Sequence, residues 1–539
     1  MTAHPHRLVD VNAAIGPWPH GNAPELDAAS LVAWMDRLGI ERALVHHSTA
    51  WLYDPATGNR RLLREIADEP RLLPCFVLGP LETGEFGDPA DLHGALASAG
   101  VRAVRVYPRD HGWTLAGGES ELLFRTVTDA GLPVLVDLAQ TDWRSVSALA
   151  AREPTLRIVV CSVGYRELRV LLPLLDRYPN LACDLSYFAA HQGVEVVVRK
   201  FGAGRLLFAT GMPGAEPAGA VACLAWADLD DASRGAIGAV NAERLLGLEG
   251  LTPLVAEPLG VTIAEAALET MLAGQPIDEL DVFDVHGHLG AWLAFWLPEQ
   301  GIESILAQMD RCGVAAISVS SLLAVGPDAL NGNEEALAAA RASNGRIFAY
   351  AVANPHRSDL SPKLERQLQL PEVVGLKIHP DTHTCPADDA AYDWVWRLAE
   401  RTGSVVLAHT FAGTPWSDPL RFVRVAQRFP GVRVILAHAG VTPDGFRRSI
   451  GVCSRYAQLV VDTSGSHMTG HWIRRLVEEI GPDRVLYGSD SPFIDLRYGL
   501  GRVIGAGLDD DTLRLVVGGN ARALLGTHPV SAHTTLRGG

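Results

Sequence analysis

The sequence predicts an α/β protein made of two tandem (β/α)8, TIM-like barrels, and three observations lead to this prediction. The chain has 539 residues, which is about the length of two barrels of roughly 250 residues each. Its two halves resemble each other in order along the chain, with an offset of about 275 residues. Each half alternates short apolar runs with amphipathic stretches, which is typical of parallel strands joined by helices.

The internal repeat rests on several matched segments. One match can arise by chance, but six matches in the same order hardly can, so the sequence indicates a duplication. The matches pair residues 10–14 with 284–288, 35–39 with 309–313, the run after Gly131 with that after Gly403, 157–164 with 433–440, 205–213 with 484–492, and 241–247 with 520–526.

Eight apolar runs in the second half are the expected strands. Their number favours a closed barrel over the alternative, a doubly wound open sheet, and neither half has a GxGxxG sequence after its first run. The runs are residues 282–285, 315–319, 347–352, 374–379, 405–409, 432–438, 459–462 and 485–487. We expect the domains to be residues 1–248 (first barrel), 249–280 (a linker with a helix at 263–272), 281–527 (second barrel) and 528–539 (a tail).

The composition excludes several classes of protein. Acidic residues exceed basic ones by 62 − 46 = 16, which argues against a nucleic-acid-binding protein. No apolar run reaches the roughly 18 residues of a membrane span, and no secretory signal is visible, so we expect a cytoplasmic protein without membrane contact. The seven cysteines are scattered with no CxxC pair, which is typical of reduced intracellular chains.

Polar residues fall at the predicted strand ends of the second half, where a barrel builds its active site. His286 and His288 are two apart on the first strand, so both side chains can face the barrel mouth. His409 ends the fifth predicted strand, His438 ends the sixth, and Asp490 follows the eighth. Each residue alone has an ordinary structural explanation, but five of them at one end of one barrel indicate a metal site.

These residues resemble the pattern of the amidohydrolase superfamily, which has HxH on strand one, His on strands five and six, and Asp on strand eight. The segments ILAHAG (435–440), DRVLYGSDSP (483–492) and NARALLG (520–526) resemble the branch that includes aminocarboxymuconate-semialdehyde decarboxylase. The resemblance covers residues 281–526 well and residues 8–248 in outline.

The resemblance implies one divalent ion, with zinc expected and manganese or iron as alternatives. Its ligands would be His286, His288, His409 and Asp490. His438 would position the bound water or a substrate oxygen, and Asp490 would also pass a proton from the water to the leaving group.

Lys377 and His379 share one face of the fourth predicted strand. Two-metal members of the superfamily carry a carbamylated lysine at a similar place, so a second ion bridged by Lys377 is one interpretation. The interpretation that we favour is a cation that balances acidic groups in the barrel or contacts a substrate anion. Only three of the 46 basic residues are lysines, which makes one at this position notable.

The first half has lost the site. Alanine and glycine offer no ligand atom, and asparagine and serine bind zinc poorly. We therefore expect a degenerate first copy that serves as a structural partner in an internal pseudo-dimer, with further homo-oligomerisation left open. His46 and His47 are expected to be ordinary loop or pocket residues. The positions that match the site hold Asn12, Ala14, Asp137, Ser162 and Gly211, and Arg105 and Tyr107 stand at the places of Lys377 and His379.

Aromatic residues follow several of the predicted strand ends in the second half. They could line a substrate pocket above the metal, or they could pack the two barrels together. These residues are Trp292, Phe295, Trp296, Phe411, Trp416 and Phe493.

Three functions compete. The first is a metal-dependent hydrolase that attacks an amide, lactone or ester of a small molecule with activated water. The second is non-oxidative decarboxylation or related C–C cleavage, for which Arg497 or Lys377 would supply a cation to the carboxylate. The third is a catalytically silent scaffold, against which the intact residues of the second half argue.

Overall fold

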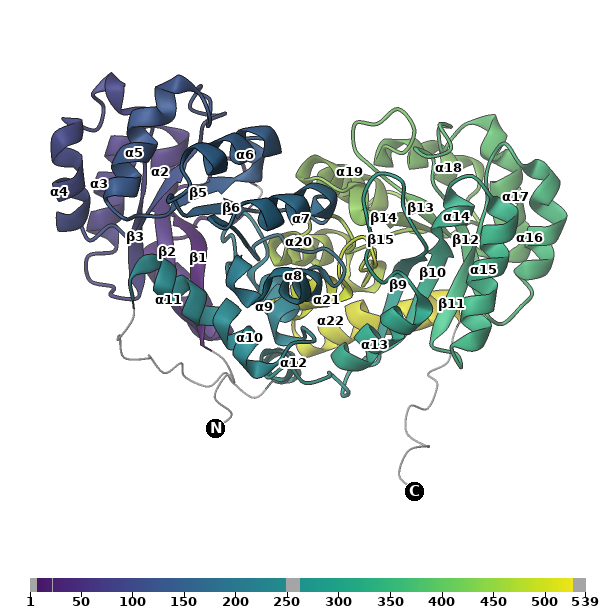
Figure 1. Ribbon diagram of the computed structural model, residues 1–539. Coiled ribbons are helices and arrows are strands. Elements are labelled where there is room, and N and C mark those ends of the chain that lie inside the picture. The colour runs from purple at the N-terminus through teal and green to yellow at the C-terminus, as the bar shows by residue number, and fades with distance from the viewer. Residues whose placement is uncertain (1–6, 22, 249–261, 527–539) are drawn as a thin grey trace. The chain divides into compact units, whose positions relative to one another are not determined.

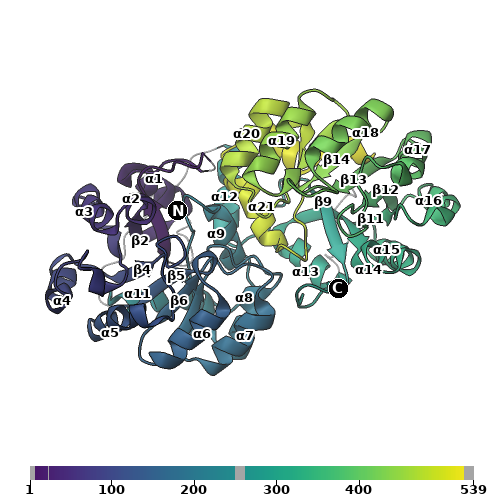
Figure 2. The ribbon, with the colours of Figure 1, turned by 90° about the horizontal axis from the view of Figure 1, so that it is seen from above.

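The computed structural model of the protein describes residues 7–21, 23–248 and 262–526. The chain divides into two compact units, residues 1–260 and 261–539. Each unit contains one eight-stranded parallel sheet whose strands follow one another in sequence order, with helices around it (Figures 1 and 2). This arrangement confirms the prediction of two tandem (β/α)8 barrels. The expected tail at 528–539 lies outside the described residues.

The first unit alternates strands and helices along the chain (Figure 1). Its strands are β1 (Leu8–Ile15), β2 (Ile40–His47), β3 (Leu72–Val77), β4 (Ala103–Val106), β5 (Val134–Asp137), β6 (Ile158–Cys161), β7 (Leu181–Asp184) and β8 (Leu206–Leu207). Its α-helices are α1 (Ala28–Leu38), α2 (Ser48–Leu52), α3 (Pro55–Glu65), α4 (Pro89–Ser98), α5 (Glu121–Asp129), α6 (Trp143–Arg152), α7 (Leu168–Arg177), α8 (Gly193–Phe201), α9 (Pro217–Ala225), α10 (Asp231–Gly235) and α11 (Asn241–Leu246).

The second unit repeats this order. Its strands are β9 (Val282–Leu289), β10 (Val314–Ser321), β11 (Ile347–Val352), β12 (Val373–Ile378), β13 (Val405–His409), β14 (Val434–Ala437), β15 (Leu459–Asp462) and β16 (Val485–Leu486). Its α-helices are α12 (Ile263–Leu272), α13 (Ile302–Cys312), α14 (Leu322–Val325), α15 (Ala329–Ala342), α16 (Ser361–Gln367), α17 (Asp393–Thr402), α18 (Phe422–Arg428), α19 (Pro443–Cys453), α20 (Gly470–Ile480), α21 (Leu496–Gly505), α22 (Asp510–Arg514) and α23 (Asn520–Leu525).

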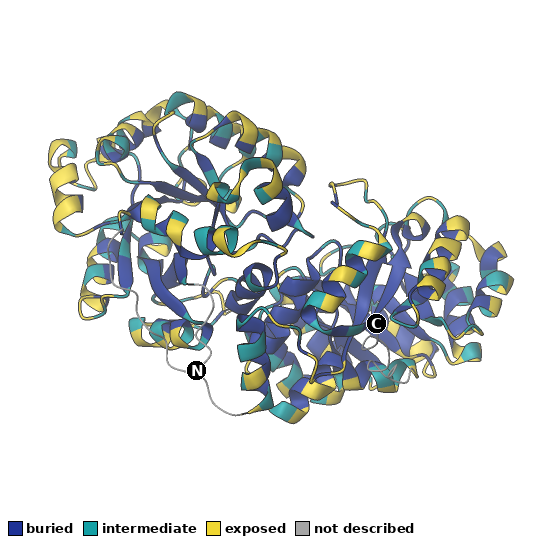
Figure 3. Ribbon diagram, turned by 60° about the horizontal axis from the view of Figure 1, so that its bottom comes forward, coloured by how far each residue is buried: buried dark blue, intermediate teal, exposed yellow. Residues whose placement is uncertain are grey.

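Main-chain hydrogen bonds close each barrel between its first strand and the segment after its last. The N–H of Val11 donates to the carbonyl of Phe208 at 3.1 Å, and the N–H of Val285 donates to that of Tyr487 at 3.0 Å. The strands are buried in both units, while the helices are exposed on their outer sides (Figure 3). Apolar side chains such as Phe283 and Leu407 fill the second barrel below its mouth, so polar chemistry is confined to the carboxyl ends of the strands.

Helix α12 coincides with the helix predicted at 263–272. It begins with a capping box in which Thr262 and Glu265 bond each other's backbone N–H. The helix packs on α21 and α22, and Asp510 accepts from the N–H groups of Ile263 and Ala264. The helix is therefore part of the second unit and not a free connector.

Two further observations concern the whole described chain. None of its helices combines the length and the apolar character needed to span a membrane. All seven cysteines are free and buried.

A close approach between two helices is repeated in both units. A Cβ placed on Gly58 of α3 would lie 2.1 Å from the backbone nitrogen of Ala50 in α2. In the second unit, a Cβ on Gly332 of α15 would lie 2.2 Å from that of Ala324 in α14. Only glycine allows these helix pairs to touch, which explains why both copies keep it.

We expect Gly58→Ala to lower the stability of the first unit by about 1–3 kcal/mol, because the added methyl group must push two backbones apart. Gly94→Ala in α4 is the matched control, since a Cβ there meets nothing within 4 Å, and its expected effect is a gain of about 0.5–1 kcal/mol. Urea unfolding followed by circular dichroism measures both. Equal stability of the two variants would contradict the close approach.

Candidate metal centre

The five predicted site residues of the second unit all lie at the carboxyl end of its barrel. His286 and His288 belong to β9, His409 ends β13, His438 follows β14, and Asp490 lies beyond β16. His438 and Asp490 adopt the left-handed backbone conformation, with φ of 63° and 66°. Such conformations are uncommon outside glycine and cluster at functional sites.

Glycine separates the two histidines of β9 because no side chain fits there. A Cβ on Gly287 would lie 2.6 Å from Cδ1 of Ile317 on the neighbouring strand β10. The pairing of β9 with β10 is irregular at this point, passing from Asp284–Ile317 to Gly287–Val319. A bulge of this kind changes the direction of the side chains that follow it.

His286, His288 and Asp490 form one group of side chains that could hold a metal ion, and their ligand atoms all lie within 4.8 Å of one another. Nε2 of His288 is 3.0 Å from Oδ1 of Asp490. Nε2 of His286 is 3.6 Å from the same oxygen. Three of the four expected ligands therefore meet at one point.

His409 lies next to this group and not within it. Its Nδ1 is 3.0 Å from Nε2 of His438, and its Nε2 is 3.4 Å from Oδ2 of Asp381. The ring stacks on that of His379 with a centroid distance of 3.9 Å. His438 links the two groups, since its ring centroid is 4.7 Å from that of His286.

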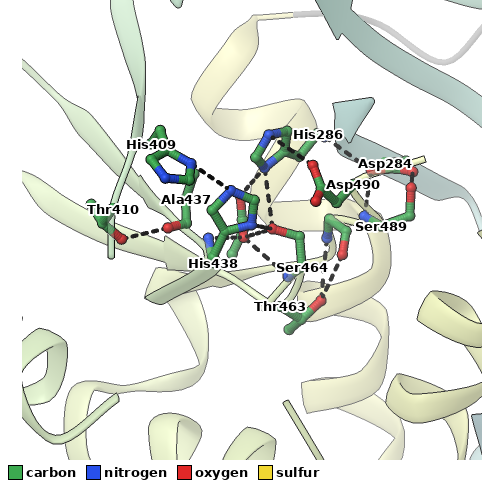
Figure 4. Close-up of polar contacts among 12 residues, drawn as sticks. Asp284, His286, His409, Thr410, Ala437, His438, Thr463, Ser464, Ser489 and Asp490 are labelled. Carbon is green, nitrogen blue, oxygen red and sulfur yellow. Dashed lines mark hydrogen bonds and ion pairs between the residues drawn. The ribbon is translucent and has the colours of Figure 1, made fainter. Parts of the chain in front are cut away.

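Asp462 and Ser464 fix the proton positions on two imidazole rings. Figure 4 shows Ser464 in contact with both His286 and His438. Oγ of Ser464 is 2.5 Å from Oδ1 of Asp462 and donates its proton there, because a carboxylate only accepts. The same oxygen therefore accepts from Nδ1 of His438 at 2.9 Å. Nδ1 of His286 donates to Oδ2 of Asp462 at 2.9 Å. Both rings thus keep their lone pair on Nε2.

The same reasoning extends to His409. Nε2 of His438 accepts from Nδ1 of His409, which leaves the lone pair of His409 on its Nε2. Nδ1 of His288 hydrogen-bonds Oγ of Ser320 at 2.9 Å, so its Nε2 faces Oδ1 of Asp490 at 3.0 Å. That contact needs a cation or a proton between the two atoms.

Burial keeps the imidazoles neutral. It lowers the pKa of His288 below its ordinary value, and it lowers the pKa values of His286, His409 and His438 well below theirs. Neutral rings with lone pairs on Nε2, fixed by hydrogen bonds at Nδ1, are the usual form of histidine metal ligands. The residues present therefore fit a divalent cation.

Lys377 reaches into this centre from β12. Its Nζ lies 2.8 Å from Nε2 of His286 and donates to the lone pair there. Burial lowers its pKa to about 8, while Asp490 and Asp462 oppose that shift. At pH 7 the amine is therefore largely a buried cation.

His379 is a hydrogen-bond donor in this arrangement. The backbone N–H of Thr382 donates to its Nδ1 at 3.2 Å, so the proton of the neutral ring is on Nε2. A nitrogen that carries a proton does not bind a metal ion. The ring therefore presents an N–H at Nε2.

Three of the six aromatic residues predicted for the pocket gather beside His288. The ring of Phe493 is 5.1 Å from those of His288 and Phe295 and 5.5 Å from that of Trp292. Trp296 is 37% exposed, and Phe411 and Trp416 are half-buried in the loop after β13. No ring contact within the described residues joins these three to the others.

Arg497, considered as a cation for a substrate carboxylate, already has a carboxylate partner. Its Nε and Nη2 donate to the two oxygens of Asp495 at 2.8 and 2.7 Å. This two-point ion pair balances its charge. Lys377 is therefore the cation closest to the histidine cluster.

The first unit keeps the supports of the centre without its ligands. Asn12 donates to Asp184 at 2.8 Å, as His286 donates to Asp462. Ser162 and Gly211, which match His438 and Asp490, also have positive φ values of 55° and 69°. Among the described residues of this unit, no three metal-binding side chains come together.

Asp462 and Ser464 were not predicted as site residues from the sequence, although the repeat contains a signal for them. The tripeptide Asp462-Thr463-Ser464 begins at the last residue of the seventh strand, and Asp184-Leu185-Ser186 stands at the same place in the first half. In both units the serine bonds its aspartate. A pair kept by both copies, with and without metal ligands, marks a supporting role.

Comparison with known proteins identifies a family. A family model described as Amidohydrolase matches the chain twice, over residues 28–248 and 283–527. A search of curated proteins finds no match.

Several solved structures match about half of the chain. The 5-carboxyvanillate decarboxylase of Sphingomonas paucimobilis matches with 17% identity over 46% of this chain and 100% of its own, with a TM-score of 0.37. A manganese-bound dihydroxybenzoic acid decarboxylase of Polaromonas sp. JS666 matches with 17% identity over 46% and 97%, with a TM-score of 0.36. A probable 2-pyrone-4,6-dicarboxylic acid hydrolase of Acinetobacter baumannii has 14% identity over 46% and 100%, and a TM-score of 0.36. At these identities the matches do not identify a reaction.

Asp10, a supporting carboxyl of the first unit, leads to a pH prediction. Burial raises its pKa to about 6, although hydrogen bonds from Thr210 and Asn12 oppose the shift. The folded chain thus holds this proton to a higher pH than the unfolded chain does. The contribution of protonated Asp10 to the free energy of unfolding is fully present below about pH 4. It is lost as the pH rises through 6.

We expect the stability of the native first unit, relative to that of Asp10→Asn, to fall by up to about 3 kcal/mol between about pH 4 and pH 6.5. Urea unfolding at a series of pH values measures this difference. A flat profile for Asp10 would show that its pKa is ordinary.

Proposed function

Because the family model matches both of its halves, the chain belongs to the amidohydrolase family, and we propose that its second unit is a metal-dependent hydrolase of a C–N or C–O bond. The substrate class is an amide, lactone or ester of a small organic molecule. The first unit is a degenerate copy without metal chemistry. We place the barrel boundaries at residues 1–248 and 281–527, as the repeat indicates.

One observation carries this proposal. Nε2 of His286 and Nε2 of His409 keep a lone pair, because Nδ1 of each ring donates a hydrogen bond. Ser320 holds Nδ1 of His288, so that Nε2 of this ring faces Asp490. Asp490 adds a carboxylate beside two of them. We therefore assign the metal to His286, His288, His409 and Asp490, with zinc as the expected ion and manganese or iron as alternatives.

A bound divalent ion supplies acidity to water and polarises a substrate carbonyl. The residues of the chain have separate tasks around it. Asp490 takes a proton from water and passes it to the leaving group. Its Oδ1 contacts His286 and His288, and its Oδ2 has no hydrogen-bond partner among the described residues. His379 donates a hydrogen bond from its Nε2–H to a substrate oxygen. His438 accepts a hydrogen bond from Nδ1 of His409 and so fixes the tautomer of that ring. His438 also lies beside the expected position of the reacting water.

The aromatic cluster favours an apolar or aromatic group on the substrate. Trp292, Phe295 and Phe493 pack together beside His288. Rings in this position exclude water from the reacting bond and contact a planar substrate by stacking. Trp296, Phe411 and Trp416 are proposed to form the outer part of the same pocket.

Decarboxylation is the second candidate, and Lys377 is the observation that favours it. A buried ammonium 2.8 Å from His286 is placed to hold a carboxylate near the metal ligands. Release of carbon dioxide without uptake of oxygen from isotopically labelled water would establish this reaction. Oxygen uptake into a product acid would establish hydrolysis.

We expect about one divalent ion per chain in the wild type and none in the His286→Ala/His288→Ala variant, because two of the four ligands are removed. Plasma mass spectrometry of the purified proteins measures the ratio. His356→Ala is the matched control, since this exposed histidine bonds only a main-chain carbonyl, and it should keep the ion. A wild type that cannot rebind metal after chelation would contradict the proposal.

Lys377→Met distinguishes the two interpretations of this lysine. We propose an internal cation that competes with the metal for the lone pair of His286 Nε2, so its removal should leave one ion per chain and strengthen metal binding by about tenfold or more. Metal titration with a chromophoric chelator measures the affinity. A fall from two ions per chain to one would instead establish a carbamylated Lys377 that bridges two ions.

A further inference from the structure

The mouth of the first barrel contains a buried arginine at the place of Lys377. Arg105 is in β4, and only 5% of its side chain is exposed. Its Nη1 donates to Oδ1 of Asn12 at 2.8 Å, as Lys377 donates to His286 in the second unit. Its Nη2 is 3.8 Å from Oδ2 of Asp137, which is a loose ion pair.

One N–H of this guanidinium lacks an acceptor. Its Nε is buried and has no hydrogen-bond partner among the residues that the structure describes. Nε and Nη2 form the edge that binds a carboxylate through two parallel N–H bonds. A buried donor without a partner is costly, so the missing acceptor is expected from outside the chain.

Neither nearby carboxylate bonds this Nε. Asp184 accepts from Asn12, from the N–H of Ser162 and from Ser186. Asp137, whose side chain is 22% exposed, accepts from the N–H of Ala139 through Oδ1 at 2.9 Å, and its Oδ2 stays 3.8 Å from Nη2 of Arg105. Nε of Arg105 therefore retains hydrogen-bonding capacity.

Aromatic side chains lie against the same arginine. The guanidinium carbon is 5.3 Å from the ring centroid of Tyr107, and Trp51 stacks on Tyr107 at 4.9 Å with an interplanar angle of 9°. Trp18 meets Trp51 edge to face at 5.7 Å. Both tryptophans are half-buried, so part of each ring is accessible beside the guanidinium group of Arg105.

We propose that the mouth of the first barrel binds the carboxylate of an aromatic acid through Nε and Nη2 of Arg105, with Trp18 and Trp51 contacting the ring. Two matched positions favour such a ligand, because Ala14 and Gly211 replace an imidazole and a carboxylate of the second barrel. The site needs no metal ion, since the guanidinium supplies the positive charge. It does not depend on the reaction of the second unit.

Isothermal titration calorimetry with benzoate on the full chain tests this site. We expect one benzoate bound with a Kd of about 1 mM or below, weaker binding of acetate, and a loss of about tenfold or more in affinity for Arg105→Met. Arg125→Met, at an exposed arginine of α5, is the matched control and should bind benzoate as the wild type does. Retention of benzoate binding in His286→Ala/His288→Ala would separate this site from the metal centre.

The benzoate experiments distinguish this site from its alternatives. Absence of benzoate binding in the wild type, binding lost in His286→Ala/His288→Ala or in Arg125→Met, or unchanged binding in Arg105→Met would each overturn the proposal. If Arg105→Met does not fold, as judged by circular dichroism, Arg105→Lys keeps the charge without the two-point fork and should also weaken binding. A crystal structure of the wild type with benzoate gives a test without any substitution, and a water molecule alone at Nε would overturn the site.

Discussion

The carboxylate of Asp462 is the constraint on which the second barrel's chemistry depends. It accepts from Nδ1 of His286, from the backbone N–H of His438 and from the hydroxyl of Ser464. Through these three bonds one buried group sets the tautomers of two rings and, through His438, that of His409. A charge buried so deeply is tolerated only because each bond reaches a fixed donor. The lone pairs available to a metal are therefore a consequence of a residue that does not touch it.

The first barrel separates what the fold requires from what the chemistry requires. It keeps Asp184 with Ser186, Asp10 with Thr210, and the positive φ values at the positions of His438 and Asp490. It has exchanged every imidazole of the site, and an arginine takes the place of the lysine. Supports are kept because they satisfy buried backbone groups, whereas ligands can be lost once no ion needs them.

Much of the architecture was predictable from the sequence, because the eight apolar runs mark buried strands and the barrel places all strand ends together. The positions of His286, His288 and Asp490 at one point followed from this alone. The orientation of His409 did not, since its ring is set by contacts with His379 and Asp381 in a loop that has no periodic pattern. Asp462 was missed for a similar reason: an aspartate at a strand end has many ordinary roles, and only the three-dimensional network shows which groups it bonds.

The shared left-handed turns after the sixth and eighth strands have an evolutionary consequence. The main chain of the first barrel still has, at Ser162 and Gly211, the conformation on which the second barrel displays a histidine and an aspartate. At these two positions the barrels therefore differ in their side chains and not in their backbone conformation. A duplicated gene of this kind retains a template on which a second centre can be rebuilt by point substitutions, without any change in chain length.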